Sequence, residues 1–204
     1  MDPEQILQFW FADSAADADK AKERYAFWFK ATPEIDAAIR TQFVDLVPEA
    51  QAGGLESWEA APRSWLALIV LLDQFPRNLY RGTAAAFASD PLAQHVVERG
   101  FSQYLPSNLS MIEQVFCLMP LQHAEHLSLQ EEALRRGEEL LAQAAPEWQE
   151  QLEEFQGSAR KHFALIQRFG RFPHRNVILG RESTLEEQEF LDSGSGSFGQ
   201  APKK

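Results

Sequence analysis

Apolar residues recur every three or four positions along most of the chain, as in the run Trp148, Leu152 and Phe155. This spacing is typical of one face of an α-helix, and the alternation of a half-buried strand is almost absent. Caps, prolines and glycines divide the pattern into separate helices. The predicted helices begin at or near the following residues: Asp2, Ala16, Thr32, Ser64, Asp90, Ser110, Ser128, Pro146, and Ser183 or Thr184.

Pairs of local signals mark the ends of several of these helices. Asp2 and Thr32 each precede a proline, which suits an N-cap followed by the first helical position. The helix that starts at Thr32 is expected to end near Gly53, and the long helix that starts at Pro146 is expected to end before Gly170. The pattern therefore predicts an all-α fold of packed helical hairpins.

The middle of the chain carries further cap signals. Asp90, which also precedes a proline, is expected to cap a helix that Gly100 closes. The spacing S-x-x-E predicts capping boxes at Ser110 and at Ser128. Pro120 lies between these two boxes and is predicted to separate two helices, because proline interrupts the hydrogen bonding of a helix interior.

The segment 64–72 is apolar on every side, which predicts a helix at the centre of the core. Pro76 is expected to disturb the path of the chain shortly after it. Asp73 follows the apolar run directly, and a carboxylate at such a place is costly unless it is paired. Arg77, four residues further on, is one candidate partner, and an arginine of the segment 171–181 is another.

Composition indicates one well-buried core. The chain has 204 residues, of which 45% are hydrophobic and 11% aromatic, and this is enough apolar material for a single domain. We expect the domain to span residues 1–192. Residues 193–204 have the composition of a linker, and we expect this tail to pack through Phe198 on the body or on a neighbouring chain. No repeat of about 34 residues is found, so a regular tetratricopeptide array is not indicated.

The acidic balance and the absence of common motifs exclude several classes of function. The formal net charge is −11, which argues against extended contact with nucleic acid. The longest apolar run, 65–72, is far shorter than the roughly 20 residues that span a bilayer. The chain also has a single cysteine, Cys117, and no secretory signal, so we expect a cytoplasmic protein. Nucleotide-binding glycine motifs, the G-x-S-x-G elbow and the C-x-x-C pair do not occur, and nothing predicts a cofactor.

Positive charge is concentrated in one stretch of the otherwise acidic chain. Between Ser158 and Arg181 there are six basic residues, five of them arginines, and no acidic residue. Aromatic residues alternate with the cations over residues 168–176, which predicts that some of these arginines are buried. A buried guanidinium group requires a partner. The partner is either a carboxylate of the protein or an anionic ligand, and the sequence leaves both alternatives open.

His123 and Glu125 form a second cluster of polar residues, in the pattern H-x-E-H that ends at His126. This spacing matches neither of the helical zinc motifs H-E-x-x-H and H-x-x-E-H, so no metal site is predicted. The two side chains could act as a general base and the group that orients it if both faced a pocket. The alternative is that they are structural polar groups with hydrogen-bond partners inside the protein.

Three stretches of the sequence resemble a known family over nearly the whole chain. These are LLDQFPRN at 71–78, MPLQHAE at 119–125 and RFGRFPHRN at 168–176, the last followed by LGREST at 179–184. They resemble the signatures of the bacterial family called domain of unknown function 924. The resemblance implies an all-helical, tetratricopeptide-like fold without an established activity. The family signature covers these residues: Asp73, Gln74, Arg77, Asn78, Arg81, Asp90, His123, Glu125, Gln130, His162, Arg171, His174, Arg175, Asn176 and Arg181.

The leading hypothesis is a pocket in which arginines from distant segments, short of protein counter-charges, bind a small anionic molecule that carries a phosphate or a carboxylate. The alternatives are a hydrolase or transferase with His123 and Glu125 as an acid–base pair, a tetratricopeptide-like adaptor for other proteins, and a purely architectural role. The oligomeric state, including a homo-oligomer, is left open. The predicted ligand-binding residues are Asp73, Arg77, Asn78, Arg81, Arg171, His174, Arg175, Asn176 and Arg181.

Overall fold

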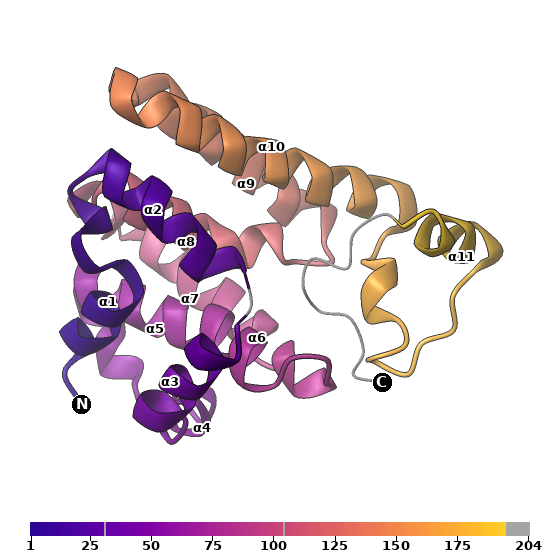
Figure 1. The fold of residues 1–204 in the computed structure, drawn as a ribbon, viewed down its shortest axis with the longest axis horizontal. Coiled ribbons are helices and arrows are strands. Elements are labelled where there is room, and N and C mark those ends of the chain that lie inside the picture. Colours follow the sequence, from indigo (N-terminus) through magenta and orange to yellow (C-terminus); the bar gives the residue numbers. More distant parts are fainter. Residues whose placement is uncertain (31, 104, 195–204) are drawn as a thin grey trace.

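The computed structural model describes residues 1–30, 32–103 and 105–194, and within these ranges the chain forms helices and no β-strand (Figure 1). The prediction of a single packed all-α domain is confirmed. Phe198 and its predicted docking lie outside the described residues. The helices are α1 (Pro3–Phe11), α2 (Ala18–Phe29), α3 (Pro33–Phe43), α4 (Leu46–Gln51), α5 (Pro62–Ile69), α6 (Phe75–Leu79), α7 (Asp90–Ser102), α8 (Met111–Gln122), α9 (Leu127–Gln143), α10 (Pro146–Phe169) and α11 (Leu185–Asp192).

Several helix ends lie where the local signals predict them. Asp2 accepts a hydrogen bond from the Glu4 amide at 3.0 Å, and Thr32 accepts one from the Ile35 amide at 3.3 Å. Thr184 begins α11 with a complete capping box. At the other end of a helix, Gly170 ends α10 in the left-handed conformation, with φ of 69°, which an L-residue with a side chain rarely adopts.

Several predicted boundaries are wrong. Pro120 does not separate helices but lies inside α8 and is buried in the core, where tertiary packing holds the helix together despite the missing amide hydrogen. Ser128 does not start α9, because the helix begins at Leu127 with His126 as its N-cap. The Ser128 hydroxyl bonds the His126 ring instead, at 3.0 Å.

Asp90 is also not a cap. The N-cap of α7 is Ser89, and Asp90 is the first helical residue. Its carboxylate is directed to Arg77 and Arg175, because two guanidinium groups are stronger partners for it than helix amides. The helix also runs two residues beyond Gly100, to Ser102.

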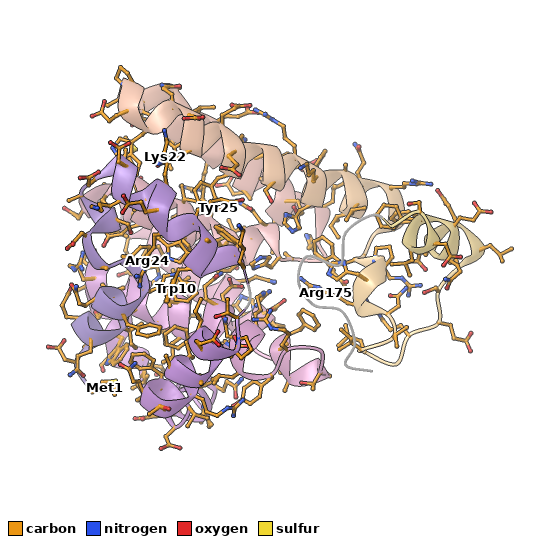
Figure 2. The ribbon with its side chains drawn as sticks, in the orientation of Figure 1. Met1, Trp10, Lys22, Arg24, Tyr25 and Arg175 are labelled. Atoms are coloured by element: carbon orange, nitrogen blue, oxygen red, sulfur yellow. The ribbon has the colours of Figure 1, made fainter. Side chains whose placement is uncertain are left out.

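The core is rich in aromatic side chains and centres on α5. Every residue from Trp65 to Leu72 is at most 3% exposed, which confirms the predicted central helix. Around it, Trp10 of α1, which is labelled in Figure 2, makes edge-to-face contacts with Phe75 and Phe116. Such contacts fix the relative orientation of the packed rings.

A π-helical turn connects α5 to α6. It spans Val70–Gln74, and the Phe75 amide donates to the Val70 carbonyl five residues earlier. Pro76 has no amide hydrogen to continue the α-helical ladder, so the wider turn accommodates it. The sequence predicted a disturbance here, and the structure shows that it takes the form of a π-bulge. Asp73 and Gln74 are on this bulge and are both buried.

The C-terminal third of the chain extends away from the main body. α10 packs along α9 and continues past it to the segment that carries α11 (Figure 1). A small second hydrophobic cluster forms there from Leu165, Ile166 and Phe172, with Phe169 and Phe190 packed against it. Among the described residues, no helix combines the length and the hydrophobicity needed to cross a bilayer.

Candidate functional site

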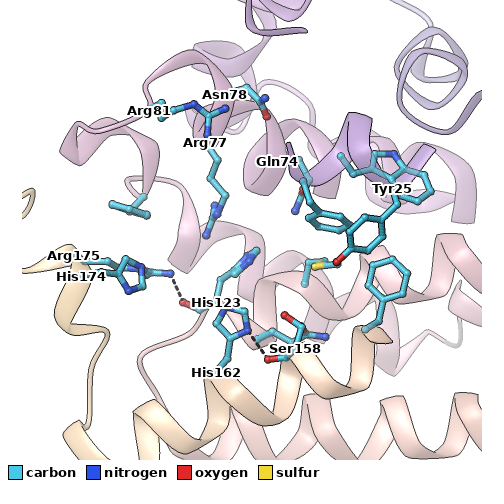
Figure 3. Close-up of a pocket in the computed structure, with 16 residues that line it drawn as sticks. Tyr25, Gln74, Arg77, Asn78, Arg81, His123, Ser158, His162, His174 and Arg175 are labelled. Carbon is cyan, nitrogen blue, oxygen red and sulfur yellow. Dashed lines mark hydrogen bonds between the residues drawn. The ribbon is translucent and has the colours of Figure 1, made fainter. Parts of the chain in front are cut away.

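A cavity of about 360 Å³ lies between the main body and the segment after α10. Five parts of the fold contribute to its wall (Figure 3). These are the end of α2, the π-bulge with α6 and the turns after it as far as Phe87, the end of α8, the middle of α10, and the turn Pro173–Arg175. The lining residues are Tyr25, Trp28, Phe29, Gln74, Arg77, Asn78, Arg81, Phe87, Met119, Gln122, His123, Phe155, Ser158, His162, His174 and Arg175.

Asp73 lies behind this wall and organises it. Its carboxylate is fully buried and accepts a hydrogen bond from His123 Nδ1 at 2.8 Å and one from the neighbouring Gln74. Arg77 Nη1 lies 3.2 Å from the same carboxylate. Burial opposes ionisation of Asp73, but the positive charge of Arg77, the adjacent His123 and the hydrogen bonds from His123 and Gln74 outweigh it and lower the pKa to about 2. Asp73 is therefore a carboxylate at neutral pH.

His123 follows α8 directly and is the C-cap of that helix. Because the ionised Asp73 can only accept, His123 Nδ1 carries the proton and Nε2 is left as the acceptor. Burial, together with the charge of Arg77, lowers the pKa of His123. The ring is thus neutral at neutral pH, and one of its two nitrogens can accept a proton in the cavity wall.

Arg77 and Arg175 share one carboxylate. Asp90 lies 2.9 Å from Arg77 Nη1 and 3.2 Å from Arg175 Nη1. Arg175 also donates to the backbone carbonyl of His123 at 3.1 Å, so the C-terminal turn is held directly against the end of α8. The arrangement brings two cations from distant parts of the chain to one wall of the cavity.

The Arg175 guanidinium is buried and incompletely bonded. The side chain is 7% exposed, and its carbon lies 4.5 Å from the ring centroid of Phe87 and 4.4 Å from that of Phe172. Its buried Nε has no hydrogen-bond partner among the described residues. Burial, with the charge of nearby Arg77, lowers the pKa of Arg175 to about 10. The positive charge of this group is therefore not fully compensated by its surroundings.

Two further histidines face the cavity and are neutral. The His162 ring bonds the Ser158 carbonyl through Nδ1 at 3.0 Å and meets the His123 ring edge-to-face. Burial lowers the pKa of His162 to about 3, with a contribution from the nearby His123. Burial lowers the pKa of His174 to about 3 as well, and the charge of Arg175 adds to this effect.

Arg81 and Asn78 lie at the edge of the cavity and are joined through one carboxylate. Asp36 of α3 accepts from Asn78 Nδ2 at 2.9 Å and from Arg81 Nη2 at 3.1 Å. Both side chains were predicted from sequence to contact a ligand, and both line the cavity.

The other predicted residues form a separate group of ion pairs that fastens the C-terminal segment. Glu125 binds Arg181 at 2.5 and 2.9 Å and accepts from the Phe172 amide at 2.8 Å. Arg171 pairs with Glu187 at 2.6 Å. These groups do not line the cavity, and neither does Asn176, which lies between the two pairs and contacts both Arg181 and Glu187.

Two expectations about the site are corrected by these contacts. Glu125 does not orient His123, because Arg181 and the Phe172 amide hold it and Asp73 takes that position. The predicted shortage of counter-charges is also wrong as a general statement. The five predicted arginines each lie within 4 Å of a carboxylate: Arg77, Arg81, Arg171, Arg175 and Arg181. Of these five arginines, only Arg175 keeps a positive charge that is not fully compensated, because it shares Asp90 with Arg77.

Sequence reasoning also missed the apolar half of the cavity. Tyr25, Phe29 and Phe155 line it, although they had the signature of ordinary core positions on amphipathic helices. The signal that distinguishes Phe29 is its 40% exposure, which periodicity does not show. Among the described residues there is no group of three or more His, Cys, Asp or Glu side chains that could hold a metal ion.

Comparison with known proteins places the chain in a family. Residues 6–195 match the family described as bacterial protein of unknown function, DUF924. A solved structure of a protein of unknown function from Agrobacterium tumefaciens is similar, with 33% sequence identity and a TM-score of 0.79. The match covers 94% of this chain and 97% of that one. No match is found among curated proteins. The chain therefore belongs to the DUF924 family.

Proposed function

We propose that the cavity binds a small molecule through a carboxylate or phosphate group. The observation that carries this proposal is the state of Arg175. This guanidinium lines the cavity, is buried, shares Asp90 with Arg77, and has an Nε without a partner in the part of the chain that the structure describes. An anion placed between Arg77 and Arg175 would balance the remaining positive charge of Arg175. The attraction would be strong because little water is present to screen it.

The arginines at one end of the cavity favour selective binding of an anion that fits the site. Arg77, Arg81 and Arg175 come from two separate segments and meet at one end of the cavity (Figure 3). Because Asp36, Asp73 and Asp90 already balance much of their charge, we expect selectivity for an anion that fits the site and only moderate affinity for a free inorganic ion.

Screening of carboxylate and phosphate metabolites by thermal shift, followed by calorimetry, tests this proposal. We expect bound compounds to lose at least tenfold in affinity in the Arg175→Met variant, because a charge-assisted hydrogen bond is lost. Arg168→Ala is the matched control, since Arg168 is an exposed arginine of the same segment that pairs with Glu186. Absence of any binder, or equal affinities for Arg175→Met and the parent protein, would reject the proposal.

The contact between Asp73 and His123 favours a second function, that of a hydrolase or transferase. A neutral imidazole whose Nδ1–H is held by a buried carboxylate is the arrangement of a general base, with Nε2 as the proton acceptor. In this proposal His123 removes a proton from a water molecule or a hydroxyl group of the substrate. Asp73 keeps the ring in the correct tautomer and stabilises the imidazolium that results.

Hydrolysis of aryl esters and aryl phosphates by the purified protein, followed by release of the phenol, tests the catalytic role. We expect His123→Gln to lower the turnover number by about 100-fold or more, the typical contribution of a general base, while the affinity for the ligand stays within a factor of a few. Equal turnover by His123→Gln would reject the role. The adaptor hypothesis stays a prediction, and no contact among the described residues favours it.

A further inference from the structure

The end of the cavity opposite the arginines is built from aromatic rings. Tyr25 and Phe29 come from the last turns of α2, and Phe155 comes from α10. The ring centroids of Tyr25 and Phe29 are 4.7 Å apart, and those of Phe29 and Phe155 are 5.7 Å apart. These contacts form a preorganised apolar surface, which costs no ordering when a ligand binds.

Phe29 is the unusual member of this wall. It is 40% exposed, whereas its neighbour Trp28 is 6% exposed and Phe155 is 7% exposed. Phe29 also lines the cavity. A partly uncovered aromatic side chain at the mouth of a cavity is a place where an apolar group gains by displacing water.

Charge separates the two ends of the cavity. In Figure 3 the labelled Arg77, Arg81 and Arg175 lie on one side and Tyr25 lies on the other. His123 lies between them, and it is neutral as described above. Tyr25 is neutral too, because burial and the nearby Glu154 raise its pKa to about 12. The aromatic end therefore carries no ionised group from its wall that would favour an ion.

The volume limits the size of the occupant. A cavity of about 360 Å³ is near the small end of the range of roughly 300–1,000 Å³ that is usual for small-molecule sites. One six-membered ring with a short linker and a carboxylate or phosphate fits within this volume. A bare inorganic anion would leave the aromatic end empty.

From the opposed arginine and aromatic ends of one cavity, we infer that the ligand of this protein is an amphipathic acid. It consists of a single aromatic ring joined by a short linker to a carboxylate or phosphate. The ring lies against Tyr25, Phe29 and Phe155, and the anionic group lies at Arg77 and Arg175. This inference rests on the proposed anion-binding function and specifies the substrate class of the same site.

Titration of the isotopically labelled full-length protein by NMR tests the inference with matched pairs of probes. The first pair is phenylacetate and acetate, and the second is phenyl phosphate and inorganic phosphate. Phenylacetamide supplies the ring without a charge. We expect each ring-bearing anion to bind roughly tenfold to hundredfold more tightly than its partner without a ring, from the burial of one phenyl group. The preferred pair distinguishes a carboxylate from a phosphate.

Variants at the aromatic end of the cavity separate recognition of the ring from recognition of the anionic group. Phe29→Ala is expected to reduce the preference for the ring by about tenfold and to leave acetate and phosphate binding unchanged. Leu127→Ala is the matched control, because Leu127 has a similar exposure of 42% and lies outside the cavity. Phe29→Leu keeps an apolar side chain at this position, so it provides a folded comparison if the alanine variant is unstable.

Each outcome has a distinct meaning. If anions bind with and without a ring equally well and Arg175→Met abolishes both, the inference is overturned and the proposed anion-binding function stands. If phenylacetamide binds as tightly as phenylacetate, the ligand does not need an anionic group. This result would overturn both the proposed anion-binding function and the inference of an amphipathic acid. Binding of none of the probes also overturns both. Tighter binding of the ring-bearing anions, weakened by Phe29→Ala and by Arg175→Met, supports both.

Discussion

Lowering the pH from 7.5 to 5.5 is expected to destabilise the protein by roughly 3 kcal/mol through two histidines. His162 and His174 are 8% and 9% exposed, and their pKa values in the folded protein are about 3. In the unfolded chain an ordinary histidine has a pKa of about 6.5. Below that pH the unfolded chain therefore binds protons that the folded protein does not.

The sign and size of the effect follow from this difference. A lowered folded-state pKa contributes stability that is present above the unfolded pKa and is lost as the pH falls below it. At pH 5.5, one unit below the unfolded value, the loss is about 1.4 kcal/mol for each histidine. His123 acts in the same direction, since its pKa is also lowered. Asp73, whose pKa is about 2, loses its contribution only in stronger acid.

Urea unfolding at the two pH values measures the effect. The readout is the difference in the free energy of unfolding between pH 7.5 and 5.5, which cancels any constant cost of a substitution. We expect His162→Gln and His174→Gln each to reduce this difference by about 1.4 kcal/mol, and the double variant to remove about 2.8 kcal/mol of it. His95→Gln is the control, because the side chain of His95 is 67% exposed.

The reasoning is refuted if the double variant shows the same pH-dependent loss of stability as the parent protein. Direct NMR titration gives a second check. Protonation of His162 or His174 near pH 6.5 in the folded protein would show that their surroundings accept the charge, in contradiction to the burial described above.

Three further predictions concern stability. Asp73→Asn is expected to cost about 3 kcal/mol, since it removes one of the two carboxylates that pair with buried Arg77; a loss below 1 kcal/mol in urea unfolding would contradict this. Gly100→Ala should destabilise by about 1–3 kcal/mol, because a Cβ there would lie 2.1 Å from the Trp65 indole. At Gly157 an added Cβ would have no described neighbour within 4 Å, so Gly157→Ala should raise the free energy of unfolding by about 0.5–1 kcal/mol. Equal melting temperatures for the two alanine variants would contradict the packing argument. Thr184→Ala removes the capping box of α11 and should cost about 1 kcal/mol, seen as faster amide exchange confined to that helix; unchanged exchange would show that packing alone holds it.

Local chemistry decided where many helices begin and end. Asp2, Thr32 and Thr184 act as N-caps, and Gly170 ends α10, because these signals depend only on residues within one turn. The same reasoning failed at Pro120, where the surrounding core stabilises a helix that the local sequence would interrupt. It failed at Asp90 as well, because the stronger partners of that carboxylate come from distant segments.

Spacing and composition are enough to predict the helical class of the fold, the central apolar helix and the residue types of the site. Of these residues, Arg77, His123 and Arg175 line the cavity. The packing of the helices sets the pairings, because ion pairs and hydrogen bonds over a few ångströms depend on which helix ends meet. It pairs His123 with Asp73 rather than with Glu125. It also placed an aromatic wall beside the cations, since helical periodicity shows that a side chain is apolar but not whether a neighbour covers it.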